Sequence, residues 1–150
     1  MKAVIQRVTK ASVTIDGKII SSIKNGILLL LGITNDDSMS DIEWLSKKII
    51  HLRIFNDENK IMNKSVIDID GNIIVISQFT LLANTKKGNR PSYIKAANRE
   101  VAIPLYEQFI TQIEKELGKK IGAGVFGADM KIELLNDGPV TIMLDSKRKE

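Results

Sequence analysis

Few side chains in this sequence are suited to nucleophilic or acid–base catalysis. There is no cysteine and there is one histidine, His51, which excludes thiolate nucleophiles, cysteine-ligated metals and, within one chain, a multi-histidine zinc site. A Ser-His-Asp triad would have to use His51, whose place at the end of a predicted helix favours a structural role. Any chemistry must therefore proceed without the usual nucleophile and base, and we expect no metal and no other cofactor.

Two polar stretches stand out against apolar sequence. One is "SQFTL", residues 77–81, which follows the apolar run 72–76. In a continuous strand, Ser77 and Phe79 would share one face, and Gln78 and Thr80 the other. Where a strand gives way to a loop, free backbone N–H groups can stabilise an oxyanion, and Gln78 or Thr80 could bind a substrate. The alternative is an ordinary strand end whose hydroxyl groups bond to neighbours.

The second stretch is "NDGPVT", residues 136–141, between two apolar runs. Asp-Gly in this setting predicts a β-hairpin, but Pro139 has no N–H to donate and biases Gly138 toward an extended conformation. Arg7 faces the same way as Ala3 and Ile5 on an otherwise apolar strand face. It is either half of a surface ion pair or a buried side chain that holds backbone carbonyls.

The basic residues gather in two places, although the net charge is a moderate +4. One is the loop with Lys86, Lys87 and Arg90, and the other is the end of the chain, residues 147–149. The functional interpretation is a surface for nucleic-acid phosphates. A solvated loop and a frayed tail are the alternative.

The hydrophobic periodicity predicts the elements that position these residues. Strand patterns cover residues 1–8, 12–15, 18–23, 27–33, 66–70 and 72–82, with two further strands flanking 136–141. Helical patterns cover residues 40–52, 92–99 and 104–117. The predicted class is α+β: a mostly antiparallel sheet that forms a partly open barrel, with helices packed on one side.

Length and composition predict one domain over residues 1–150. Hydrophobic residues make up 43% and charged residues 27% of the chain, as is typical of globular proteins. The charged start "MKAVIQRV" differs from a signal peptide, and the longest apolar run, residues 27–31, is too short to span a bilayer. We expect a soluble, cytoplasmic protein that does not enter the membrane.

"SQFTL" and "NDGPVT" resemble the two signature motifs of the D-aminoacyl-tRNA deacylases, also called D-tyrosyl-tRNA deacylases. The resemblance extends to "QRVTKASV" at 6–13, "KGNRPSY" at 87–93 and "FGADM" at 126–130. It thus covers the whole chain. It implies a homodimeric editing hydrolase that cleaves the ester between a D-amino acid and the terminal adenosine of tRNA, and that also removes glycine.

The resemblance also implies roles for particular residues. Ser77, Gln78, Phe79 and Thr80 match the motif that lines the pocket. Gly138 and Pro139 match a cis Gly-Pro element that enters the partner subunit's site, where its carbonyls hold the substrate ammonium and its bulk excludes an L side chain. Arg7 matches the arginine that secures this element.

An aminoacyl ester is already activated, and the neighbouring ribose 2′-OH can supply or orient a proton. The enzyme then has only to position the ester and stabilise the oxyanion. We therefore expect RNA-assisted hydrolysis in which Thr80 helps without being an obligatory nucleophile. Two alternatives remain: a tRNA- or rRNA-binding module without catalysis, and a relative with a trans Gly-Pro peptide that acts on small L-amino acids.

Overall fold

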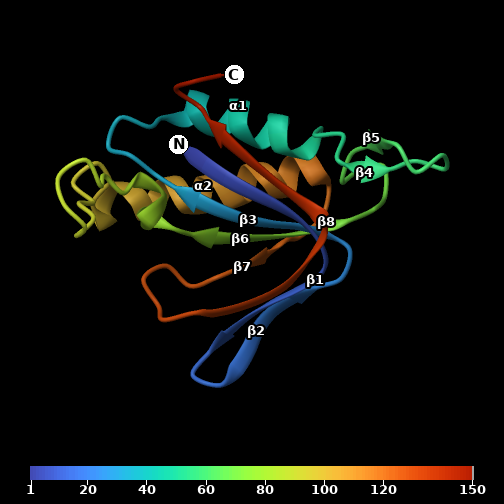
Figure 1. The fold of residues 1–150 in the computed structure, drawn as a ribbon, viewed down its shortest axis with the longest axis horizontal. Helices are drawn as coiled ribbons and strands as arrows, with labels where there is room; N and C mark the ends of the chain where they lie inside the picture. The colour runs from blue at the N-terminus through green and yellow to red at the C-terminus, as the bar shows by residue number, and fades with distance from the viewer. Residues whose placement is uncertain (150) are drawn as a thin grey trace.

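A mixed sheet forms the body of the molecule (Figure 1). The computed structural model describes residues 1–149. Five strands follow the order β2-β1-β3-β6-β7, and the sixth strand, β8, pairs with β1. Their bounds are β1 Lys2–Ile15, β2 Lys18–Ile23, β3 Gly26–Gly32, β6 Asn72–Ser77, β7 Gly122–Ala123 and β8 Lys131–Asp145.

The sheet curls into a nearly closed barrel, because the edge strand β2 comes into contact with β6 and β7. The strand pairs of β1 are antiparallel, whereas β6 runs parallel to both β3 and β7. The apolar runs of β3 and β6 are buried along almost their whole length, as is typical of parallel strands covered on both faces. The predicted α+β class and barrel are confirmed.

Two helices, α1 (Met39–Ile50) and α2 (Arg99–Leu117), pack together on one side of the sheet (Figure 1). Ile42, Leu45 and Ile49 of α1 are fully buried, as are Phe109 and Ile113 of α2. Their spacing of three or four residues places each set on one helical face. These side chains and the inner face of the sheet form the main core.

Several predicted strand bounds are wrong. Residues 1–8 and 12–15 belong to one long strand, β1, which continues into β2 through the predicted Asp16-Gly17 turn. Residues 66–70 form turns instead of a strand, because Ser65 bonds to Asp68 and the Gly71 amide returns to the Val66 carbonyl. The 72–82 strand ends at Ser77.

The short elements were missed by the periodicity because two to four residues carry too little of it. They are β4 Phe55–Asn56, β5 Met62–Lys64, β7 and the 3₁₀ helix η1 Phe79–Leu82.

The predicted helix over residues 92–99 is absent, and α2 starts earlier than predicted. Residues 92–98 form turns and isolated bridges. Asn98 caps α2, because its side chain accepts a hydrogen bond from the Val101 amide at 3.0 Å. Pro104 therefore lies inside the helix and not in its first turn.

The predicted hairpin at residues 136–141 is wrong. β8 follows β1 over its whole length, with Asn136 opposite Val8 and Thr141 opposite Gln6. Four residues of β8, 137–140, thus face the single residue Arg7. The segment is a large bulge in a continuous strand pair, which is one way for a sheet to present a few residues to the outside.

Candidate functional site

A cleft of about 350 Å³ opens where β6 ends. Ser77, Gln78 and Phe79 line it, together with the 126–130 segment and the start of α2. Ser77 is paired with Leu31 of β3, and the Gln78 amide donates to the Leu31 carbonyl at 2.7 Å. The cleft therefore lies at the carboxyl ends of two parallel strands, a position where ligands commonly bind.

The chain leaves β6 directly into η1, so the alternation predicted for residues 77–81 stops at Ser77. The first N–H groups of a helix have no partner within that helix. The Phe79 and Thr80 amides at the start of η1 are therefore available as donors, and Phe79 itself lines the cleft. The Thr80 hydroxyl accepts a hydrogen bond from the Gln78 side-chain amide at 2.5 Å, so its partner is an amide and not a general base.

Aromatic rings form the outer and inner walls of this region. Phe79 is 55% exposed, and its ring meets that of Tyr93 edge-to-face with 4.9 Å between the ring centroids. On the inner side, Phe126 meets the ring of Tyr106 at 5.9 Å. Burial raises the pKa of Tyr106 to about 12, and its hydroxyl donates to the Val75 carbonyl at 2.8 Å. Tyr106 is therefore a neutral structural group at neutral pH.

Side chains suited to acid–base catalysis are sparse around the cleft. His51 is exposed at the end of α1 and does not line the cleft. Asp129 does line it, but its exposed carboxylate is paired with Lys131 at 2.9 Å. Among residues 1–149 no three His, Cys, Asp or Glu side chains gather as metal ligands would. The donors at the cleft are thus mainly backbone amides.

Arg7 holds the bulge of β8 from the inside. Its side chain is buried, with 6% of the residue exposed. Nε donates to the Asp137 carbonyl at 2.9 Å and Nη1 donates to the Ile54 carbonyl at 2.6 Å. Nε also lies 3.3 Å from the Asp137 carboxylate. Of the two interpretations of Arg7, the structure shows the buried side chain that binds backbone carbonyls.

Asn136 holds the same bulge from the strand side, a role that we did not predict. Its side-chain oxygen accepts from the Val140 amide at 2.8 Å, and its side-chain nitrogen donates to the Thr141 hydroxyl at 3.1 Å. The available signal was an asparagine two residues before Gly138, because Asn often bonds to nearby backbone groups in turns.

Gly138 and Pro139 form the exposed tip of the bulge. The peptide bond between them is cis. Gly138 has φ +129°, and a Cβ atom placed there would lie 2.9 Å from both Arg7 Nη2 and Val140 Cγ2. Glycine is therefore required by the close approach of the arginine as well as by the backbone conformation.

Within one chain, residues 77–81 and residues 136–141 lie far apart. Arg7 pairs with Ile27 at the start of β3, and Ser77 pairs with Leu31 near its end. The four intervening steps correspond to roughly 13 Å along the sheet, in addition to the spacing between strands. In Figure 1 the middle of β8 lies at the right, whereas β6 ends at the left.

Comparison with known proteins identifies the family. The family model described as D-Tyr-tRNA(Tyr) deacylase matches residues 4–145. The chain belongs to this family. The resemblance seen in the sequence is confirmed, and with it the prediction of a member of a hydrolase family.

Relatives named D-aminoacyl-tRNA deacylase align with this chain over its full length. The protein from Flavobacterium psychrophilum is 65% identical over 150 residues, and that from Bacteroides fragilis is 63% identical over 150 residues. In both cases the alignment covers 100% of each chain.

Two solved structures share the fold. The c-Myc DNA Unwinding Element Binding Protein is 46% identical, with a TM-score of 0.89 and coverage of 97% of this chain and 98% of that one. A probable eukaryotic D-amino acid tRNA deacylase is 15% identical, with a TM-score of 0.82 and coverage of 95% and 97%. At that identity the second structure supports the fold alone.

The basic loop of this family member follows η1. Its ends are joined by two hydrogen bonds between the backbones of Asn84 and Ser92, at 2.8 and 2.9 Å. Lys86, Lys87 and Arg90 are exposed in it, and Tyr93 connects its far end to Phe79. The loop is therefore tied to the rim of the cleft at both ends.

Neither α1 nor α2 has the length and apolar character that a membrane-crossing helix needs, and the same holds for every helical segment within residues 1–149.

Proposed function

We propose that this protein hydrolyses the ester of D-aminoacyl-tRNA and releases the free D-amino acid and tRNA. The observation that carries the proposal is the match to D-aminoacyl-tRNA deacylases at 65% and 63% identity over whole chains. The cleft supports it independently, because its donors are suited to an ester that needs little chemical activation. The place of action that we propose is the cytoplasm, where aminoacyl-tRNA is used.

The proposed reaction relies on positioning and on backbone N–H groups. Water attacks the ester carbonyl carbon, and the developing oxyanion accepts hydrogen bonds from the Phe79 and Thr80 amides. The bond from this carbon to the ribose 3′ oxygen then breaks. A proton reaches the leaving oxygen with the help of the neighbouring 2′-OH. Gln78 orients the Thr80 hydroxyl, and Ser77 completes the pocket wall.

We assign two roles to Gly138 and Pro139 of a second subunit. They bind the α-ammonium of the substrate, and they discriminate between the D and L configurations at its Cα. Because the bulge and the cleft lie at opposite ends of β3, a site that uses both needs two chains, and we propose a homodimer. Backbone carbonyls at the bulge would bind the ammonium, and its surface would leave no room for an L side chain. Glycine has no side chain to exclude, so glycyl-tRNA is a proposed second substrate.

Exclusion is an effective filter for chirality. A missing or added apolar contact typically changes selectivity by about 1–3 kcal/mol, whereas overlap with a fixed backbone costs more. The bulge is fixed by Arg7 on one side and Asn136 on the other. Firm attachment of the exposed tip is what such a wall needs.

The phosphates near the acceptor end of the tRNA are assigned to the basic loop. Lys86, Lys87 and Arg90 are exposed and next to the cleft rim, where the phosphates of an acceptor end would lie. Contacts of this kind contribute affinity that depends on salt but not on sequence.

A paired assay with D-tyrosyl-tRNA and L-tyrosyl-tRNA tests the function. With protein well below the substrate concentration, we expect repeated turnover of the D ester and no measurable turnover of the L ester. Binding of tRNA without release of D-tyrosine would instead support the RNA-binding alternative. Release of small L-amino acids in preference to D-tyrosine would support the alternative with L specificity.

Pro139→Ala tests the chiral wall in the same assay. Loss of the ring should open space at the tip and lower the ratio of D to L turnover by about 10- to 100-fold, which corresponds to about 1–3 kcal/mol. An unchanged ratio would remove Pro139 from the proposed filter.

A further inference from the structure

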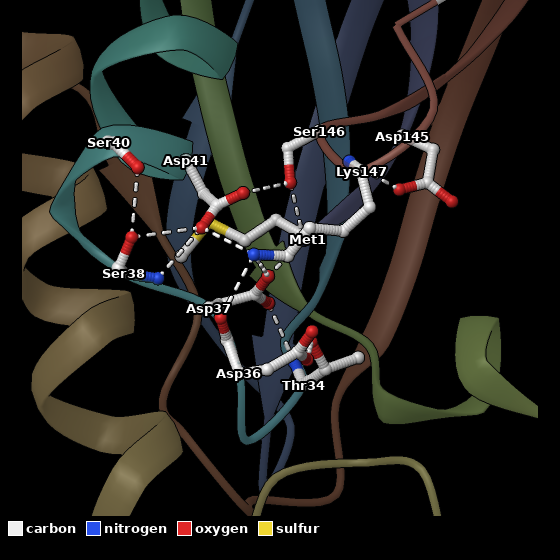
Figure 2. Close-up of polar contacts among 10 residues, drawn as sticks. All are labelled: Met1, Thr34, Asp36, Asp37, Ser38, Ser40, Asp41, Asp145, Ser146 and Lys147. Carbon is white, nitrogen blue, oxygen red and sulfur yellow. Dashed lines mark hydrogen bonds and ion pairs between the residues drawn. The ribbon is translucent and has the colours of Figure 1, made fainter.

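The α-ammonium group of Met1 is buried in a polar cluster made by distant parts of the chain (Figure 2). We call Met1, Asp37, Asp41, Ser146 and Lys147 the N-terminal cluster. Met1 is 1% exposed, and its side chain belongs to the main core. Its ammonium donates to Asp37 Oδ1 at 2.5 Å and to Ser146 Oγ at 2.7 Å.

The partners of the ammonium are themselves held in place. The second oxygen of Asp37 accepts from the Thr34 amide at 2.7 Å, and the Ser146 amide donates to the Met1 carbonyl at 2.9 Å. Ser146 Oγ in turn donates to Asp41 Oδ1 at 2.7 Å. Throughout the described part of the chain, no buried side-chain nitrogen or oxygen lacks a partner. The buried polar side-chain atoms of the cluster therefore bond to one another and to nearby backbone, and need no further partner.

The charges in the cluster also balance. Lys147 Nζ lies 2.9 Å from the Asp41 carboxylate and 3.7 Å from that of Asp37. Burial raises the pKa of Asp41, but hydrogen bonds from Lys147 and Ser146 outweigh this and hold the pKa far below its usual range. The Asp37 side chain is 0% exposed, and Met1 provides the nearest positive charge.

We propose that the α-amino group of Met1 is a site whose acylation or extension is incompatible with the stable fold. An N-formyl or N-acetyl group would replace the ammonium by an uncharged amide with a single N–H. It would also add atoms where Asp37 and Ser146 now lie. Asp37 would then keep only the more distant Lys147 as a counter-charge, and a buried charge that loses its partner is strongly destabilising.

The reaction class that supplies the competent chain is hydrolysis of an N-terminal formamide, wherever synthesis starts with N-formylmethionine. Water adds to the formyl carbon, the carbon–nitrogen bond breaks, formate leaves and the nitrogen takes up both protons of the water. The product carries the ammonium that Asp37 binds.

The N-terminal cluster lies at the same end of the sheet as the cleft. Lys2 pairs with Gly32, where an added Cβ would lie 3.2 Å from the Gln78 carbonyl and from Leu81 Cβ. The turn that contains Asp37 also connects to the cleft wall, because the Ala97 amide donates to the Ile33 carbonyl at 2.9 Å. A loosened N-terminus should therefore disturb the cleft as well.

The test compares two forms of the full chain. A ubiquitin fusion, cleaved behind the last ubiquitin residue, releases protein that starts at Met1, and a second fusion leaves Gly-Ser before Met1. Intact mass verifies each N-terminus. We expect the extended form to have an unfolding equilibrium constant at least about 100-fold larger and a Tm lower by roughly 10 °C. Failure of the extended form alone to fold would support the same conclusion.

A cycle that combines the N-terminal extension with Asp37→Asn tests whether Asp37 is the partner of the Met1 ammonium. If the ammonium acts through Asp37, the extension should have a much smaller effect in the Asp37→Asn background than in the wild type. Asp16→Asn, in the exposed β1–β2 turn, is the control and should leave the effect of the extension unchanged. Ser146→Ala provides a milder change in the same cluster.

Equal stability of the two forms, or effects that simply add in the cycle, would overturn the proposal. Unfolding is measured without substrate, so this result does not depend on the proposed deacylase activity. The expected loss of D-tyrosyl-tRNA turnover in the extended form does rest on that activity. If both forms are inactive but differ in stability, the proposed function fails and the inference about Met1 stands.

Discussion

Residues 77–80 lie where a parallel strand ends, whereas residues 137–139 bulge from the middle of an antiparallel pair. Ser77, Gln78 and Phe79 of the first motif line a cleft within their own chain. The second presents an exposed tip that is far from that cleft and is held by a buried arginine. The contrast indicates two kinds of sensitivity: the cleft motif should tolerate side-chain changes, and the bulge should not.

Arg7→Met should have the largest effect, because it removes the hydrogen bonds to the Asp137 and Ile54 carbonyls. We expect the free energy of unfolding to fall by about 2–4 kcal/mol and D-tyrosyl-tRNA turnover to fall by at least about 100-fold. Urea unfolding and the deacylation assay measure these changes.

Arg53→Met is the matched control, because Arg53 also donates to a backbone carbonyl, that of Asn63 at 2.9 Å, but is exposed. It should change both quantities only slightly. Equal losses in the two variants would mean that burial of Arg7 is not what makes the bulge sensitive.

Gly138→Ala tests the bulge at a single atom. The new Cβ would lie 2.9 Å from Arg7 Nη2, and the alanine would have to adopt a strained backbone conformation at φ +129°. We expect stability to fall by about 1–3 kcal/mol and D-ester turnover to fall by about 10- to 100-fold. Gly17→Ala, in the β1–β2 turn, shares a positive φ, +75°, but its Cβ meets nothing within 4 Å. A similar loss of turnover in Gly17→Ala would contradict a specific role for the bulge.

Thr80→Ala tests the cleft motif. The variant keeps the backbone amide and loses the hydroxyl that accepts from Gln78. We therefore expect turnover of D-tyrosyl-tRNA to fall by about 10-fold or less, with unchanged unfolding. A loss beyond about a thousandfold in a folded variant would indicate a nucleophilic hydroxyl and reverse the proposed mechanism.

The basic loop should show the smallest effects. Lys86→Ala, Lys87→Ala and Arg90→Ala should each weaken tRNA binding a few-fold and lower the salt dependence of binding by about 0.7–0.9 in slope per lost phosphate contact. Lys18→Ala, on exposed β2, should leave the slope unchanged. Equal slopes in all variants would remove the loop from the proposed tRNA surface.

The sequence determined the class of fold and the identity of the candidate residues. The continuous apolar runs at 27–33 and 72–76, the Asp16-Gly17 turn and the spacing within residues 40–52 each depend on local chemistry, and the structure has these elements close to where they were predicted. "SQFTL" and "NDGPVT" were likewise visible as polar interruptions of apolar sequence.

What the tertiary structure decided is how these segments meet. Asp-Gly predicts a hairpin locally, but pairing with all of β1 kept β8 continuous and forced residues 137–140 out as a bulge. Burial of Arg7 also depends on Asp137 and Ile54, which lie 130 and 47 residues away. The distance between the two motifs follows from strand register, and the contacts of Met1 with Asp37 and Ser146 follow from the pairing of Lys2 with Asp145 of β8 and Gly32 of β3. None of these is encoded in local periodicity, because each is a choice among partners remote in the chain.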